Sequence, residues 1–136
     1  MLVYAHREGA ERHEEYRGWL RSVAEGAEPY GIPDVVAMGF LRVVTHPKVW
    51  AVPTPIDTAL EAMRVVRERP NHVHVSPGPR HWGLFADLCR SAAAKGNLVP
   101  DAFLAAVAIE SGAELATTDR DFARFSGLRW GHPLDG

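Results

Sequence analysis

The sequence predicts an α/β fold, in which a parallel β-sheet is flanked by α-helices. Helical and extended patterns alternate along the 136 residues, and an apolar helix at residues 102–110 leads directly into an extended segment at 114–118. A strand entered from a helix in this way usually pairs in parallel, because the helix supplies the crossover connection. The length suits one domain and no linker or repeat interrupts it, so we expect residues 1–136 to form a single domain.

The first half predicts one extended segment and three helices. Residues 2–5 form an apolar run that predicts the end of a strand. Apolar side chains spaced three and four apart predict a helix over 13–23, which a glycine ends. Prolines open the next two helices, expected over 33–44 and 55–69, because a proline at the first helical position loses no hydrogen bond.

The second half alternates between short extended segments and helices. A Pro-Gly-Pro sequence at 77–79 interrupts the chain before a helix. We expect strands at 72–75, 114–118 and 128–130, helices at 82–89 and 102–110, and a short helical turn after residue 119.

Composition excludes several classes of protein. Cys89 is the only cysteine, so an intrachain disulfide and a cysteine zinc cage are excluded. No apolar run reaches the roughly 18 residues of a membrane span, and the start lacks a secretory signal pattern, so we expect a cytoplasmic protein without membrane contact. The net charge of −2 argues against a generally basic nucleic-acid-binding domain but not against a local basic patch.

Acidic side chains recur where the predicted fold places ligand sites. In open α/β sheets, ligands bind beyond the carboxyl ends of the strands, where helices also begin. Any one aspartate there is explained by its preference for helix starts and turns, but several converging carboxylates repel one another unless a cation neutralises them. Oxygen ligands suit Mg²⁺ or Mn²⁺, which support phosphodiester hydrolysis. The candidate metal ligands are Asp34, Asp101, Asp119 and Asp121.

Other chemistries lack their signatures. The chain contains no phosphate-binding glycine loop, no G-x-S-x-G and no H-E-x-x-H sequence. A phosphatase or dehalogenase would need a nucleophilic aspartate after the first strand, where Glu8 is the only nearby acid. His72 and His74 are expected to face solvent. Arginines that would hold RNA phosphates, or simply be solvated, are Arg42, Arg80 and Arg120.

Five segments resemble the PIN-domain toxins called VapC. They are VYAHR at 3–7, GFLRVVTHP at 39–47, PGPRHW at 77–82, NLVPDAFLAA at 97–106 and TTDRDFARF at 117–125. The resemblance implies a PIN fold, a homodimer, and Mg²⁺- or Mn²⁺-dependent cleavage of structured RNA such as transfer RNA. It also implies a cognate VapB antitoxin whose tail blocks the acidic pocket.

The resemblance also assigns residues. The family's helix-entry aspartate falls on Asp101 and its strand-end acid on Asp119, with Asp121 beside it and the second-helix acid at Asp34. The family's D-x-N sequence on the first strand would precede Met1, and we expect a start codon further upstream. The alternative is a weakened or inactive truncated nuclease that acts as an antitoxin-binding module.

Overall fold

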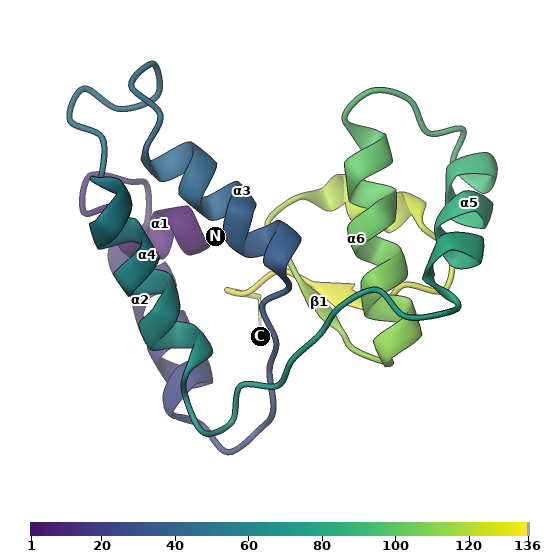
Figure 1. The fold of residues 1–136 in the computed structure, drawn as a ribbon, viewed down its shortest axis with the longest axis horizontal. Coiled ribbons are helices and arrows are strands. Elements are labelled where there is room, and N and C mark those ends of the chain that lie inside the picture. The colour runs from purple at the N-terminus through teal and green to yellow at the C-terminus, as the bar shows by residue number, and fades with distance from the viewer. Residues whose placement is uncertain (136) are drawn as a thin grey trace. The chain divides into compact units, whose positions relative to one another are not determined.

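Within residues 1–135, which the computed structural model describes, the chain forms six α-helices, one short 3-10 helix and a two-stranded sheet (Figure 1). The chain divides into two compact units, Met1–His74 and Val75–Gly136, and each has its own apolar core. The predicted combination of helices with a parallel sheet is confirmed.

The first unit is built from helices. They are α1 (Leu2–His6), α2 (His13–Glu25), α3 (Asp34–Val44) and α4 (Ile56–Arg67). The three helices predicted in this half are confirmed as α2, α3 and α4, and prolines stand at the N-caps of the last two. Phe40 and Val44 of α3 pack with Ala59 and Met63 of α4, so these two helices supply most of the core.

The strand predicted at residues 2–5 is wrong, because this segment is the helix α1. The amide of Ala5 donates to the carbonyl of Met1 and that of Arg7 to Val3, both at 2.9 Å. A strand needs a neighbour to satisfy its backbone groups, whereas a helical turn satisfies them within the segment. The tyrosine rings of Tyr4 and Tyr16, 5.2 Å apart, hold α1 against α2.

The strand predicted at 72–75 is reduced to a single bridge. Tyr30 and His72 form an isolated parallel pair, in which Tyr30 donates to Asn71 and accepts from Val73. His72 is only half-buried, and its Nε2 accepts the amide of Ile32 at 3.1 Å. The alternating sequence at 72–75 therefore forms a single β-bridge and not a strand with continuous backbone pairing.

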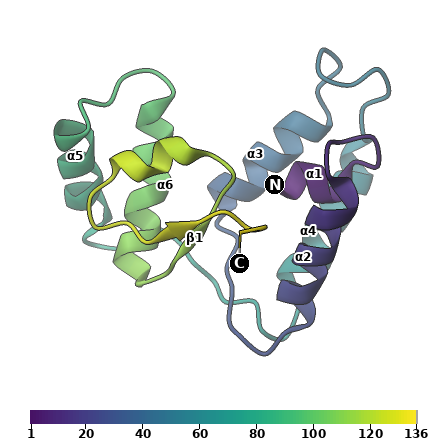
Figure 2. The same cartoon turned by 180° about the vertical axis from the view of Figure 1, so that it is seen from behind.

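The second unit places two helices beside a short parallel sheet. Its elements are α5 (His81–Ser91), α6 (Leu98–Ser111), β1 (Leu115–Ala116), the 3-10 helix η1 (Arg120–Arg124) and β2 (Trp130–Gly131). β1 and β2 are parallel, with Leu115 opposite Trp130. Figure 2 shows α5 beside α6, with β1 and η1 on another side of α6.

Helix α6 is the centre of the second unit. Ala102, Ala105 and Ala106 are fully buried, and these small side chains let α5 and η1 pack closely on it. Gly112 ends the helix with a positive φ of 71°, which glycine adopts without steric strain. Neither α6 nor any other helix in residues 1–135 is long and apolar enough to cross a membrane.

Candidate active site

Asp101 lies in the first turn of α6. Pro100 precedes it, and proline is tolerated there because the first amides of a helix have no partner within it. The neighbouring Ala102 is fully buried, which fixes the rotation of the helix and leaves the carboxyl group of Asp101 partly buried. The prediction that this aspartate opens a helix is confirmed.

Asp119 and Asp121 follow strand β1 at the start of η1. Asp119 is the N-cap of η1, and its Oδ1 accepts the amide of Asp121 at 2.9 Å. The amide of Asp119 in turn donates to Oγ1 of Thr117 at 3.1 Å. These two bonds hold the exposed Asp119 side chain in place, because they fix its backbone as well as one carboxylate oxygen.

The second unit brings the three aspartates into one electrostatic group. Burial raises the pKa of Asp101 above its ordinary value, and the negative charges of Asp119 and Asp121 raise it further. Both causes act against the ionised carboxylate, so a positive charge at this place would relieve them.

The oxygen donors fit a hard divalent cation by their chemistry. Carboxylate oxygens are the usual ligands of Mg²⁺ and Mn²⁺, and no sulfur or imidazole belongs to this group. Within residues 1–135, however, no three Asp, Glu, His or Cys side chains lie close enough together to hold a metal ion between them.

Asp34 has a different environment in the first unit. It lies in the first turn of α3, as predicted, and its side chain is 85% exposed. Nη2 of Arg67 on α4 donates to Oδ1 of Asp34 at 2.6 Å, and this bond lowers the pKa of Asp34. The carboxylate is therefore already neutralised by a cation of its own unit.

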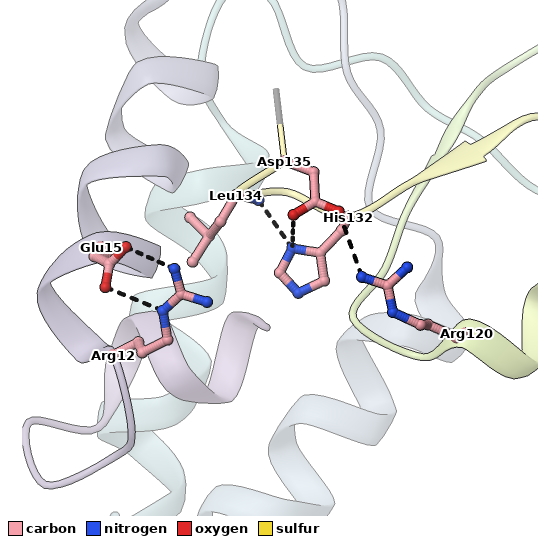
Figure 3. A network of polar contacts seen from close by, with 6 residues as sticks. All are labelled: Arg12, Glu15, Arg120, His132, Leu134 and Asp135. Atoms are coloured by element: carbon pink, nitrogen blue, oxygen red, sulfur yellow. Dashed lines mark hydrogen bonds and ion pairs between the residues drawn. The ribbon is translucent and has the colours of Figure 1, made fainter.

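The three arginines predicted to hold phosphates are all exposed. Arg42 is in the last turn of α3, and Arg80 precedes α5. Nη2 of Arg120 lies 3.4 Å from Oδ2 of Asp135, and Asp135 also lies near His132 (Figure 3). Such an exposed ion pair contributes little to stability.

Sequence reasoning missed Glu110, near the end of α6. Its carboxylate accepts the amide of Gly78 at 2.6 Å and the amide of Arg80 at 2.8 Å. Both bonds lower the pKa of Glu110, the one from Gly78 more strongly. The sequence held only an indirect signal for this contact. Glu110 is an acid in an otherwise apolar helix, and a Pro-Gly-Pro sequence stands about thirty residues earlier.

The second unit has a parallel sheet, an acid just after strand β1 and another acid in the first turn of α6. This arrangement belongs to a class of α/β protein that similarity to known proteins identifies. The family model of the PIN domain matches residues 1–128. "VapC ribonuclease Mb2897" of Mycobacterium bovis and "Ribonuclease VapC43" of Mycobacterium tuberculosis are each 46% identical over 136 residues, which cover 100% of this chain and 92% of the relative. "Ribonuclease VapC25" of M. tuberculosis is 37% identical over 129 residues, 95% of this chain and 91% of the relative. The chain belongs to the VapC family of PIN-domain proteins.

Proposed function

We propose that this protein is the toxin of a type II toxin–antitoxin pair, an endoribonuclease that hydrolyses RNA phosphodiester bonds with Mg²⁺ or Mn²⁺. The observation that carries the proposal is the group formed by Asp101, Asp119 and Asp121, whose charges raise the pKa of Asp101. The ribonuclease names of the relatives support the same activity.

The carboxylate group supports a metal site through its unfavourable charge. Three neighbouring carboxylates, one of them partly buried, cost folding free energy unless a cation binds. Binding of a cation to the folded protein would offset this cost and raise the unfolding free energy. Asp34, by contrast, has a basic partner in Arg67.

Each acid has a distinct part in the proposed site. Asp101 and Asp119 are the principal ligands, and Asp121 contributes beside Asp119. The fourth acid predicted from the sequence, Asp34, lies in the first unit, where Arg67 binds it. The bound cation would activate a water molecule and stabilise the leaving oxygen. The protein holds Asp119 through Thr117 and the amide of Asp121, so that its free oxygen stays oriented.

The arginines contribute RNA binding. Arg42, Arg80 and Arg120 are exposed, and a guanidinium group binds a phosphate through two parallel hydrogen bonds. Arg120 would leave Asp135 for the phosphate, since their 3.4 Å contact is long and solvated. The proposed substrate is structured RNA such as transfer RNA.

The proposal includes partners and a cellular setting. A VapB-type antitoxin would inhibit the protein by covering the acidic group, and the active form would be a homodimer in the cytoplasm. The support is the membership of the VapC family.

RNA cleavage and Mn²⁺ titration of the same preparations test the proposal. With Mn²⁺ the parent should cut transfer RNA, and Asp101→Asn should cut it about a hundredfold more slowly, because losing a metal ligand removes about 3 kcal/mol of transition-state stabilisation. The matched control is Asp87→Asn, which removes an exposed aspartate paired with Arg90 on α5 and should leave cleavage unchanged.

Two results would contradict the proposal. If Asp101→Asn cut RNA as fast as the parent, Asp101 would not belong to the site. A parent that binds a VapB antitoxin but neither Mn²⁺ nor RNA would instead be the antitoxin-binding module without catalysis.

A further inference from the structure

Glu110 fastens the turn that leads into α5. Its Oε1 accepts the amide of Gly78 and its Oε2 the amide of Arg80, while the amide of His81 donates to the carbonyl of Gly78 at 3.1 Å. Charge-assisted bonds to backbone amides are stronger than neutral ones. The backbone on either side of Pro79 is thereby tied to helix α6.

Gly78 leaves room for this carboxylate. A Cβ atom at position 78 would lie 2.8 Å from Oε2 of Glu110, closer than two such atoms approach in proteins. Any side chain at this position would push the carboxylate away from the amides. The fit of Glu110 against Gly78 therefore fixes the start of α5 and, with it, the exposed Arg80.

Trp82 is displayed by the same turn. It is 69% exposed, and the edge of its ring rests on Phe85 with the centroids 5.1 Å apart. Phe85 in turn contacts Phe103 of α6 at 5.6 Å. Beside them, Nε2 of the buried His81 donates to the carbonyl of Phe103 at 2.9 Å. The indole thus stands on a rigid aromatic base while most of its surface meets water.

The surroundings of Trp82 favour an unpaired nucleotide as its occupant. Within residues 75–135, Val99 is the only other exposed large apolar side chain, so no broad apolar patch suited to a second protein surrounds the indole. Arg80, two residues away, supplies an exposed cation. An aromatic ring beside an arginine is the combination that binds a base and its phosphate in single-stranded RNA.

We propose that Trp82 stacks on an unpaired RNA base while Arg80 binds the adjoining phosphate, and that Glu110 is the positioning residue that holds both in place. This inference rests on the proposed function, because it assigns residues to the binding of the RNA substrate. It adds a base contact that is independent of the carboxylate group.

The test measures binding of a short unstructured oligoribonucleotide by fluorescence anisotropy, with EDTA present so that the RNA is not cut. Trp82→Leu should weaken binding about tenfold, the usual effect of losing one stacked base, whereas Trp82→Phe should retain most of the affinity. An oligonucleotide that lacks the base at the stacked position should bind the parent about tenfold more weakly than intact RNA does. The Trp82→Leu variant should bind the abasic and the intact oligonucleotide equally well.

Salt dependence tests Arg80 and Glu110. Arg80→Gln should lower the slope of log affinity against log salt concentration by about 0.7, the value for one phosphate contact in a single strand. Glu110→Gln, which keeps only one acceptor for the two amides, should lower the slope in the same direction. Because Glu110 acts on the phosphate contact only through Arg80, the double variant should have the same salt slope as Arg80→Gln alone.

Matched controls separate these effects from charge and hydrophobicity in general. Arg90→Gln removes an exposed arginine from the last turn of α5, and Leu60→Ala an exposed apolar side chain from α4. Both should bind RNA as the parent does.

Three outcomes would overturn the inference. Parent-like RNA binding by Trp82→Leu would remove the base contact while leaving the proposed ribonuclease intact. A change in the self-association of Trp82→Leu, with unchanged RNA affinity, would assign the indole to contact with a second copy. A parent that neither binds nor cuts RNA would overturn the inference together with the proposed function.

Discussion

The two units differ in how they treat their carboxylates. In the first unit, Arg67 binds Asp34 at 2.6 Å, and Arg12 binds Glu15 at 2.8 Å on α2, a pair also drawn in Figure 3. Arg64 of α4 likewise binds Glu61 of the same helix and Glu68, its C-cap residue. These acids are neutralised by side chains of their own unit, and they need nothing else to be stable.

In the second unit, the acids of the candidate site have other carboxylates as neighbours. Among the ion pairs within residues 1–135, none involves Asp101, Asp119 or Asp121. The same unit pairs Asp87 with Arg90, so arginines are available to its surface acids. The difference teaches that burial together with neighbouring negative charge, more than the mere presence of acids, distinguishes Asp101 from an ordinary surface acid.

The largest expected effect comes from changing Asp119, and two variants separate its proposed role as a metal ligand from its role as the N-cap of η1. Asp119→Asn keeps an oxygen for the amide of Asp121 but loses the charge, so RNA cleavage should fall about a hundredfold while stability is kept. Asp119→Ala should show the same loss of cleavage and also lose about 1 kcal/mol of unfolding free energy, because the cap is removed. Cleavage rates and urea denaturation measure the two effects. Equal stability of both variants would mean that the cap contributes nothing.

A second expectation concerns metal binding and stability. Mn²⁺ at about 100 times its dissociation constant should raise the unfolding free energy of the parent by about 2.7 kcal/mol, since the cation binds the folded carboxylate group. Asp101→Asn should show a much smaller rise, whereas Glu15→Gln, which removes a paired acid of the first unit, should respond as the parent does. Thermal denaturation with and without Mn²⁺ measures this. A metal response that survives Asp101→Asn would place the cation elsewhere.

The smallest expected effect is a difference in titration between Asp101 and the acids that accept hydrogen bonds, Asp34 and Glu110. Without metal, Asp101 should titrate above its ordinary pKa of 3.8, whereas Asp34 should titrate below 3.8 and Glu110 below 4.5. The stability contributed by Asp34 and Glu110 is present above these ordinary values and is lost as the pH falls through their lowered pKa values. The contribution of Asp101 has the opposite sign, because it is complete at acid pH and is lost as the pH rises through its raised pKa.

Carboxyl NMR titration measures these pKa values directly. The contrast requires Asp101 and Asp34, which share an ordinary value of 3.8, to move in opposite directions. Added Mg²⁺ should bring the pKa of Asp101 down. Identical titration of the two aspartates would show that the units do not differ in the way proposed.

The sequence predicts elements well where their ends carry explicit signals. Helix α4 begins after Pro55 and α6 ends at Gly112, and both signals act locally through the backbone. Residues 2–5 carry no such signal, because four apolar residues fit a strand and a helical turn equally well. The surrounding structure decides between a strand and a helical turn, so the sequence did not predict the helix α1.

The candidate site shows the same division. Asp101 and Asp119 are found from their positions at a helix start and after a strand, and the structure places both there. Glu110 binds amides about thirty residues earlier in the chain, and backbone amides leave no trace in a sequence. Contacts of this kind are visible only in three dimensions.

If Asp119 binds a cation as proposed, its hydrogen bond from the amide of Asp121 would bear on which cation is selected. Because Oδ1 already has a donor at 2.9 Å, Oδ2 is the oxygen left for a cation. One-oxygen coordination suits the small octahedral shell of Mg²⁺, whereas Ca²⁺, with its larger shell, readily takes both oxygens of a carboxylate. A single backbone amide would thus favour the smaller ion at the proposed site.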